Sequence, residues 1–327
     1  MIISRTPLRM SFVGGGSDLP VFYRRFGGAV VSTTINQFVY VTVNKKFDRS
    51  IRLSYSRTEE ASSVARIRHP LVREALKMLG IQGGIEITSI ADVPSKGTGL
   101  GSSSSFTVGL LHALHAYAEH HAGAEQLARE ACQIEIDRCA EPIGKQDQYA
   151  AAFGGLNFIR FNPDDSVVVE PIICKRHTIE QIQANTLTFY TGITRNASGI
   201  LQRQQSAVTS EKKKQTVMRR MTELAGQLRR DLQANRAETL GEIIHEGWVL
   251  KKSLTPGIST DVIDQWYARA RKAGAVGGKL LGAGAGGFLM FQAPCERHDA
   301  VAHALRGLRR VDFRFEAQGS RIIFVHH

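Results

Sequence analysis

The 327-residue sequence has few of the features that mark several large classes of protein. Its four cysteines show no C-x-x-C spacing and are too sparse for a disulfide framework. No apolar run approaches the roughly 20 residues that a membrane-spanning helix needs. The first 16 residues lack the apolar core and small-residue cleavage site of a signal peptide. These absences favour a reduced, cytoplasmic protein that has no membrane partner.

Two familiar nucleotide-binding signatures are also missing. The sequence contains no G-x-x-x-x-G-K-[ST] motif, which excludes a P-loop enzyme. Segment 282–287, GAGAGG, has the glycine spacing of a dinucleotide fingerprint, but it precedes the strand-like segment 288–291 and not a helix. That context excludes a dinucleotide site, since the fingerprint places its phosphates at a helix N-terminus. Segment 282–287 alone indicates a tight turn or a close backbone contact.

The sequence carries an excess of positive charge, with 42 Lys and Arg against 30 Asp and Glu and a net charge of +12. A basic balance is typical of proteins that meet nucleic acids, anionic membranes or phosphorylated metabolites. The basic residues are spread along the chain, and the dense run at 211–220 is interpreted as the solvated face of a helix. Nucleic-acid binders concentrate their charge. We therefore expect a phosphorylated small molecule and no nucleic-acid partner, with a nucleic-acid binder kept as a rival.

The pattern of apolar residues and breakers predicts an α+β chain. Strands are expected at 2–13, 29–35, 38–43, 84–88, 155–159, 166–169, 187–190, 288–291 and 322–325. An amphipathic helix is expected at 104–121, a second helix at 125–139, and a mainly helical region at 197–273. The pattern changes near residues 183–186. We therefore expect one domain over residues 1–184 and a second over residues 185–327.

The strongest local signal is segment 94–105, PSKGTGLGSSSS, between an expected strand and an expected helix. Glycines let backbone N–H groups approach an anion, and a helix N-terminus offers unpaired donors and the positive end of a dipole. The serine hydroxyls add donors, and one could reach a Mg²⁺ ion. A flexible loop with ordinary serine caps is the alternative. The position between a strand and a helix favours a phosphate-binding loop.

Two acidic residues follow the expected phosphate loop. Glu135 shares an apolar helical stripe with Ala128 and Cys132, and a buried carboxylate needs a partner. That partner is either an arginine in a structural ion pair or a Mg²⁺ ion. Asp147 is expected in a loop after Pro142, where it either caps a following helix or accepts a proton from a substrate hydroxyl.

The glycine turn that ends the first strand also carries a candidate acidic residue. Asp18 lies in the turn 14–18, GGGSD, where an aspartate is commonly part of the turn chemistry. Carboxylates beside tight turns are also good acceptors for paired sugar hydroxyls. Both interpretations stay open at this point.

Taken together, three segments resemble the GHMP kinases, the superfamily of galactokinase, homoserine kinase and mevalonate kinase. They are 5–18, 94–105 and 278–287, and their order and spacing match along nearly the whole chain. The resemblance implies a GHMP kinase fold of class α+β. It would combine an N-terminal domain similar to domain 2 of ribosomal protein S5 with a ferredoxin-like C-terminal domain, and place the active site between them.

The resemblance also implies roles for individual residues, with ATP and Mg²⁺ as cofactors. Asp147 would face the sugar hydroxyl, Arg9 would stabilise the transferring phosphoryl group, and Ser103 with Glu135 would hold Mg²⁺. The implied ligands of ATP are Lys96, Gly97, Gly99, Gly101, Ser102, Ser103, Ser104 and Ser105. The implied glycine motif for the phosphates is Gly282, Gly284 and Gly286. The implied ligands of the sugar are Gly15, Gly16, Ser17, Asp18 and Arg195.

Within the superfamily, segments 6–20, 146–155 and 191–195 are most similar to bacterial D-glycero-D-manno-heptose 7-phosphate kinases. These enzymes phosphorylate the anomeric hydroxyl and give a 1,7-bisphosphate. One departure lies in the phosphate loop, where this chain has GSSS at 101–104 and those kinases often carry GGSS. Alternatives are an L-fucose, galactose or hexosamine kinase, or a non-catalytic sugar sensor. We also consider a homodimer, and Arg138, Lys145 and Arg195 as ligands of the sugar's distal phosphate.

Overall fold

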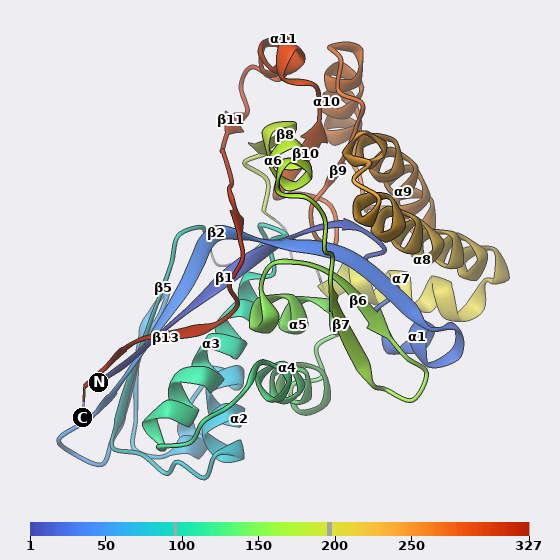
Figure 1. Ribbon diagram of the computed structural model, residues 1–327. Helices are drawn as coiled ribbons and strands as arrows, with labels where there is room; N and C mark the ends of the chain where they lie inside the picture. The colour runs from blue at the N-terminus through green and yellow to red at the C-terminus, as the bar shows by residue number, and fades with distance from the viewer. Residues whose placement is uncertain (95–96, 195–197, 327) are drawn as a thin grey trace.

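A computed structural model describes residues 1–94, 97–194 and 198–326, which form two β-sheets with helices around them (Figure 1). Six strands of the larger, nine-stranded sheet follow the order β13-β1-β2-β5-β3-β4, while β6 and β12 pair with β2 and β7 pairs with β6. The strands of this sheet are β1 (Ile2–Val13), β2 (Gly28–Lys45), β3 (Ile51–Ser54), β4 (Thr58–Ala61), β5 (Ile85–Ala91), β6 (Leu156–Phe161), β7 (Val167–Pro171), β12 (Phe315–Glu316) and β13 (Arg321–Val325).

The antiparallel pair β1 and β2 forms the backbone of this sheet. Two separate strands were expected at 29–35 and 38–43, but the structure shows one continuous strand, β2. The reason is a shift in register, because Leu8 pairs with Ile35 while Pro7 pairs with Phe38. Proline has no N–H for a ladder and is tolerated at such an irregularity. The bulge therefore absorbs the two extra residues without ending the strand.

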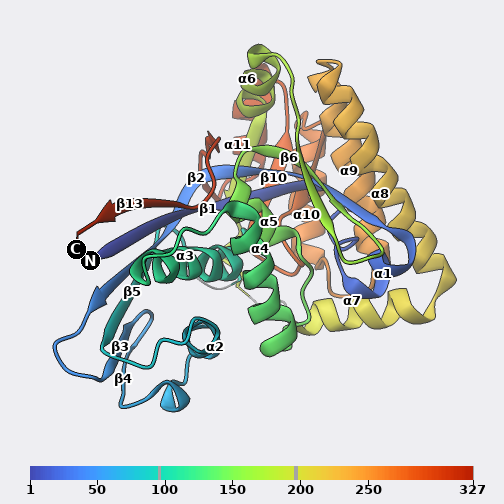
Figure 2. The same cartoon turned by 60° about the horizontal axis from the view of Figure 1, so that its bottom comes forward.

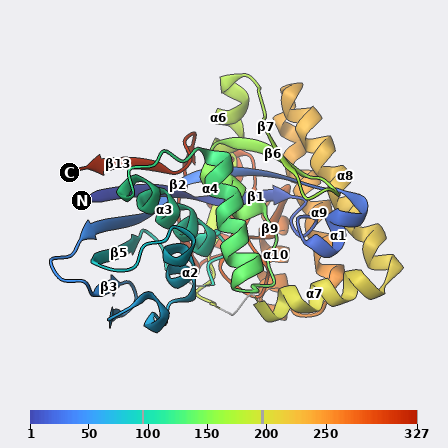
Figure 3. The ribbon, with the colours of Figure 1, turned by 90° about the horizontal axis from the view of Figure 1, so that it is seen from below.

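One face of the larger sheet is covered by helices, as the view from below shows (Figure 3). These helices are α2 (Pro70–Met78), α3 (Ser102–Tyr117), α4 (Ala124–Cys132) and α5 (Gln146–Phe153). Helix α3 packs against β1 and β2 and also contacts the other three helices. The helix expected at 104–121 is therefore confirmed as α3, but its expected amphipathic character is wrong, because it is buried on most sides.

The second sheet is antiparallel and has the order β11-β8-β10-β9. Its strands are β8 (Thr186–Tyr190), β9 (Gly277–Leu280), β10 (Phe288–Gln292) and β11 (Arg309–Arg310). Numbered within this half of the chain the order is 4-1-3-2, which is that of a ferredoxin-like sheet. Helix α9 (Leu240–Leu254) packs on β9 and β10, and α10 (Asp261–Lys272) packs on β9. Buried Trp248, Leu289 and Phe291 lie in this second core.

Other helices join the two sheets or flank them (Figure 2). They are α1 (Pro20–Phe26), α6 (Arg176–Ala184), α7 (Ser198–Ser210), α8 (Lys212–Gln233) and α11 (His298–Ala304), with short 3-10 turns at Val64–Arg66, Ala237–Thr239 and Cys295–Arg297. Helix α8 contacts both β2 and α9, so it bridges the two cores. Lys212 and Lys213 at its start are exposed, in agreement with a solvated basic face.

The end of the chain returns to the first sheet. Strand β12 pairs with β2, and β13 pairs with β1 along the sheet edge. The termini therefore lie side by side, as Figure 1 shows, and the Met1 amino group donates to the His326 carbonyl. The division of the chain into one domain over residues 1–184 and a second over residues 185–327 stays a proposal. Within the described residues, no helix has both the length and the apolar character that crossing a bilayer requires.

Candidate active site

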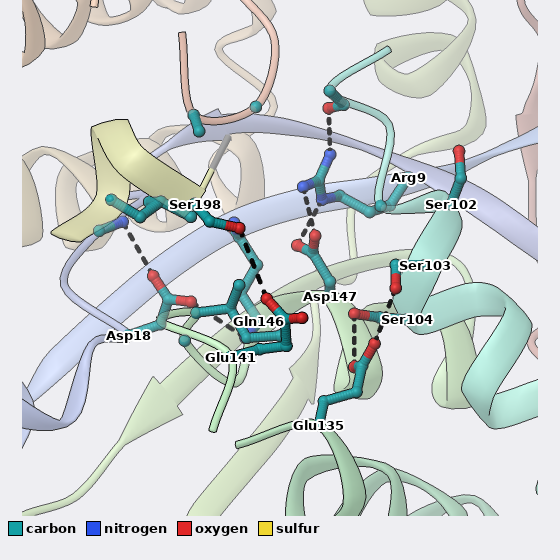
Figure 4. A pocket seen from close by; sticks show the side chains of 18 of the residues that line it. Arg9, Asp18, Ser102, Ser103, Ser104, Glu135, Glu141, Gln146, Asp147 and Ser198 are labelled. Carbon is teal, nitrogen blue, oxygen red and sulfur yellow. Dashed lines mark hydrogen bonds and ion pairs between the residues drawn. The ribbon is translucent and has the colours of Figure 1, made fainter. Parts of the chain in front are cut away.

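A cavity of about 710 Å³ lies where the phosphate loop, the turn after β1 and the second half of the chain meet. Figure 4 shows polar side chains from distant segments pointing into it. The described residues that line it are Arg9, Gly16, Asp18, Leu19, Gly97, Thr98, Gly99, Gly101, Ser102, Ser103, Ser104, Glu135, Glu141, Ile143, Gly144, Gln146, Asp147, Thr194, Ser198, Leu201, Gln204, Lys251, Gly282 and Ala283.

The phosphate loop forms one wall of the cavity. Gly101 adopts a left-handed conformation (φ 77°) immediately before α3, and no side chain of the described residues caps the first turn of that helix. The N–H groups of this turn are therefore free of a side-chain acceptor, as an anion site requires. Gly99 also has a positive φ of 75°, and a Cβ there would lie 2.2 Å from the Leu281 carbonyl oxygen. Close backbone packing between two glycine motifs thus shapes this wall.

Glu135 lies beside the loop at the bottom of the cavity. A continuous helix was expected at 125–139, but α4 ends at Cys132 and a π-helical turn, Gln133–Arg138, carries Glu135. Such turns are frequent at functional sites. The carboxylate is buried and accepts hydrogen bonds from Ser103 Oγ (3.1 Å), Ser104 Oγ (2.8 Å), Thr107 Oγ1 (3.1 Å) and Gln148 Nε2 (2.6 Å).

These four neutral donors bear on one of the two partners considered for Glu135, the arginine of a structural ion pair. No arginine of the described chain pairs with it, so the structural ion pair with arginine is wrong. Burial raises the pKa of Glu135 to about 7, and the hydrogen bonds from Ser104, Gln148 and Ser103 oppose that rise. A carboxylate held without a cation in the cavity wall fits a metal ligand. Ser103 donates its proton to Glu135, and its lone pairs remain to coordinate a hard cation.

Asp147 and Arg9 form a bidentate ion pair above Glu135 (Figure 4). Arg9 Nε donates to Asp147 Oδ1 at 2.8 Å, and Arg9 Nη2 donates to Oδ2 at 2.7 Å. Arg9 Nη1 donates to the Gly99 carbonyl at 2.6 Å. Asp147 was expected in a loop, but it lies in the first turn of α5, which begins at Gln146. The pair therefore has a fixed orientation, connected directly to the phosphate loop.

Asp18 lies at the other end of the cavity and is only 5% exposed. Its carboxylate accepts the N–H groups of Gly16 (2.8 Å) and Gln146 (3.2 Å), and no cation of the described residues pairs with it. Burial, together with the charge of Asp147, raises the pKa of Asp18 above its ordinary value. A buried carboxylate without a cation is a suitable acceptor for hydroxyl groups, because their hydrogen bonds can replace those to the water that burial removes.

The structure divides the residues predicted from sequence into two groups. Twelve of them line the cavity: Arg9, Gly16, Asp18, Gly97, Gly99, Gly101, Ser102, Ser103, Ser104, Glu135, Asp147 and Gly282. Gly15, Gly284 and Gly286 do not line it, and Lys96 and Arg195 lie outside the described residues. Ser105 Oγ donates instead to the Pro7 carbonyl, and Ser17 Oγ bonds to Ala29. These two hydroxyls hold the walls together.

The candidates for a distal phosphate are held elsewhere. Lys145 Nζ pairs with Asp165 at 3.2 Å and lies over the Tyr23 ring, and neither Lys145 nor Arg138 lines the cavity. Arg138 donates to the Glu74 carbonyl at 3.5 Å. Arg195, outside the described residues, is the remaining candidate of the three.

Twelve of the lining residues were missed by the sequence analysis, and two of them, Gln204 and Lys251, are buried polar side chains on helices of the second half of the chain. Gln204 on α7 is fully buried. Among the described residues, its Oε1 has no hydrogen-bond partner and its Nε2 has one, the Met218 sulfur at 4.0 Å. Lys251 on α9 is 6% exposed and continues the buried stripe of Ile244 and Trp248. A lysine at that helical spacing on an apolar stripe was the available signal. For Gln204 the surrounding pattern gave none.

Comparison with known proteins agrees with this fold. Residues 65–155 match the model of the GHMP kinases N terminal domain, and residues 228–311 match that of the GHMP kinases C terminal. A D-glycero-alpha-D-manno-heptose 7-phosphate kinase from Campylobacter jejuni subsp. jejuni serotype O:2 is 30% identical over 97% of each chain.

Solved structures give the same result. A D-glycero-D-manno-heptose 1-phosphate kinase from Bacteroides thetaiotaomicron has a TM-score of 0.82 at 26% identity, over the full length of both chains. A putative sugar kinase from Campylobacter jejuni has a TM-score of 0.78 at 28% identity, over 98% of this chain and 97% of the other. Fold, cavity and relatives define a small-molecule kinase. The chain belongs to the GHMP kinase family. It is a sugar kinase, a phosphotransferase with an alcohol group as acceptor.

Proposed function

We propose that the protein transfers the γ-phosphoryl group of ATP to the anomeric hydroxyl of D-glycero-D-manno-heptose 7-phosphate, giving the 1,7-bisphosphate. The observation that carries the proposal is a single cavity with a phosphate loop at one end, an uncompensated Asp18 at the other, and the Arg9–Asp147 pair between them. The full-length similarity to a heptose 7-phosphate kinase supports this sugar. We propose a cytoplasmic location and keep a homodimer as a hypothesis.

The cavity suggests how each residue contributes. The first turn of α3 and Gly97–Gly101 would bind the phosphates of ATP through backbone N–H groups. Asp147, oriented by Arg9, accepts a hydrogen bond from the attacking hydroxyl and holds it in line. Asp18 and Gln204 Oε1, which has no hydrogen-bond partner among the described residues, would bind other hydroxyls of the sugar. Ser103 and Glu135 would hold Mg²⁺, whose chemistry is to neutralise the phosphate oxygens.

The main alternative is a different sugar. Bifunctional fucokinases from Arabidopsis thaliana and Bacteroides fragilis are each 26% identical, and a galactokinase from Pyrococcus furiosus is 24% identical. A non-catalytic sensor is disfavoured because Ser103, Glu135 and Asp147 are all present and meet at one cavity.

An ADP-release screen separates these functions. The substrates are heptose 7-phosphate, L-fucose, galactose and N-acetylhexosamine, each with MgATP. We expect the highest kcat/KM with heptose 7-phosphate. A higher value with a free sugar would move the assignment to that sugar, and ADP release with none of them would favour the sensor.

A further inference from the structure

Lys251 is a buried cation in the cavity wall that the account above leaves without a role. It lies in the last turn of α9, and its Nζ donates to the Gly282 carbonyl oxygen at 2.8 Å. This is its one hydrogen bond to the described residues, and it forms no ion pair with them. An ammonium group has three donors, so two N–H groups of Lys251 have no acceptor among the residues that the structure describes. The side chain nevertheless lines the cavity.

Burying a charged group without a counter-ion opposes folding. Burial lowers the pKa of Lys251 to about 8, and the charges of Asp18 and Asp147 only partly compensate. Arg9 and the neighbouring buried Lys279 add positive charge on the same side. Lys279 itself donates to the Ser11 and Phe12 carbonyls and does not line the cavity. An anionic ligand of the cavity would supply the charge that Lys251 lacks.

The charges along the cavity show where that anion would lie. Arg9 is the other cation among the described lining residues, but its charge is compensated by Asp147 at hydrogen-bond distance. Lys251 bonds to Gly282, and a Cβ on Gly282 would lie 2.4 Å from Gly99 Cα in the phosphate loop. The charge of Lys251 is also felt by Asp18 and Asp147 at the sugar end. Lys251 therefore lies at the junction of the nucleotide end and the sugar end.

We propose that Lys251 is a catalytic residue that donates hydrogen bonds to a non-bridging oxygen of the transferring phosphoryl group. The inference rests on the proposed kinase function and adds a residue to it. In the transfer, the sugar oxygen forms a bond to the γ-phosphorus and the bridging bond breaks. ADP leaves with the bonding electrons, and the hydroxyl proton passes to Asp147 or to water. Lys251 keeps its protons and stabilises charge on the equatorial oxygens.

The test is the variant Lys251→Gln, which keeps a donor for the Gly282 carbonyl but removes the positive charge. We expect kcat to fall about 100-fold, the size of effect that follows loss of one transition-state donor. The KM for ATP and the melting temperature should stay near the wild-type values. Lys252→Met is the matched control, because Lys252 lies on the same helix, pairs with Asp264 at 2.9 Å and does not line the cavity. Its kcat should stay within twofold of wild type.

Several outcomes would overturn the inference. A kcat of Lys251→Gln within threefold of wild type would leave only a structural bond to Gly282. A raised KM for ATP with unchanged kcat would mean that Lys251 shapes the loop and does not touch the transferring group. If the wild-type protein transfers phosphate to no sugar, the proposed function fails. If the wild type is active and Lys251→Gln is equally active, only the role of Lys251 fails.

The pH dependence of wild type is a second test that needs no variant to fold. Lys251 faces Asp18, Asp147, Arg9 and Lys279, so its protonation changes the charge of the cavity directly. The value of kcat/KM for ATP reports the free enzyme. It should decrease above about pH 8, where burial places the pKa of Lys251, while the protein stays folded. A flat profile up to pH 9.5 would contradict the proposal.

Discussion

Both carboxylate oxygens of Asp147 accept hydrogen bonds from Arg9, one from Nε and the other from Nη2. Such a bidentate pair fixes direction as well as distance. Glu135, in contrast, is held by three hydroxyls and one amide, without a cation. The two carboxylates are therefore prepared for different tasks. We propose that Asp147 binds the attacking hydroxyl and that Glu135 binds a cation.

Replacing Asp147 with asparagine should nearly abolish turnover. The amide keeps the shape of the side chain, but it loses the charge and one of the two acceptors for Arg9. We expect kcat to decrease by more than 100-fold while ATP affinity stays within a few-fold, measured by ADP release and by nucleotide titration. Asp164→Asn, on an exposed turn, is the control. Turnover within tenfold of wild type would remove Asp147 from the reaction.

Glu135→Gln should raise the Mg²⁺ concentration needed for half-maximal activity by about tenfold. A neutral amide binds a hard cation more weakly than a carboxylate does. The amide nitrogen would also face the donor of Gln148, so some loss of thermal stability is expected as well. The two effects separate in a Mg²⁺ titration run beside a melting curve. An unchanged titration with a lower melting temperature would assign Glu135 a purely structural role.

The lowered pKa of Lys251 leads to a prediction about the stability of the fold that does not depend on catalysis. Its pKa is lowered by burial from 10.5 to about 8, so between these values the unfolded chain holds a proton that the folded protein has released. Stability then rises with pH in that window. In urea unfolding, wild type should gain stability relative to Lys251→Met between pH 7.5 and 9.5. The difference in free energy of unfolding between wild type and Lys252→Met should not change over this pH range. If the difference for Lys251→Met does not change either, the pKa of Lys251 is not lowered by folding.

At the scale of elements, the two glycine motifs act as one structure. Gly99 precedes α3 and Gly282 follows β9, and their backbones touch where a side chain would not fit. This contact explains why a glycine cluster without the context of a dinucleotide site is present near the end of the chain. The contact with Gly282 fixes the position of the loop at Gly99 from a different part of the chain.

Gly282→Ala should therefore weaken ATP binding. The added Cβ would lie 2.4 Å from Gly99 Cα, and the residue has a φ of 81°. We expect the KM for ATP to rise at least tenfold, with a stability loss of about 1–3 kcal/mol from backbone strain. Gly80→Ala is the matched control, since Gly80 has a φ of 69° but nothing within 4 Å of an added Cβ. If both variants keep the wild-type KM, the contact does not shape the site.

Periodicity and breakers predicted most elements of this fold, but not their partners. The strand at 322–325 was expected, yet its place beside β1 depends on a contact across more than 300 residues. The phosphate loop, Glu135 and Asp147 were predictable because glycine spacing and a carboxylate on an apolar stripe are local signals. Lys251 had a local signal in its place on an apolar helical stripe, whereas Gln204 had none, and tertiary packing brings both to the cavity.

At the scale of the whole molecule, the cavity joins both halves of the chain. The phosphate loop, Glu135 and Asp147 come from the first half, while Gln204, Lys251 and Gly282 come from the second. Lys279 also ties β9 to the end of β1 through the Ser11 carbonyl at 2.7 Å. Ligands that contact both halves are therefore expected to stabilise the whole fold by mass action.

The substrate's distal phosphate should add to this binding. We expect kcat/KM for the 7-phosphate sugar to exceed that for the free sugar at least tenfold, about 1.4 kcal/mol of differential binding in the transition state. Arg195→Ala should remove much of the preference and leave activity on free sugar nearly unchanged. Arg203→Ala, an exposed arginine of α7, is the control. Equal use of free and phosphorylated sugar by wild type would rule out the heptose 7-phosphate assignment and leave the GHMP kinase family intact.

The position of the transferred phosphate is read directly by ³¹P NMR of the product formed from heptose 7-phosphate and MgATP. For transfer to the anomeric hydroxyl we expect one new sugar phosphate whose phosphorus couples to the anomeric proton, together with the retained 7-phosphate signal and one ADP per product. A new phosphate on any other carbon, or ATP consumption without a sugar bisphosphate, would contradict it.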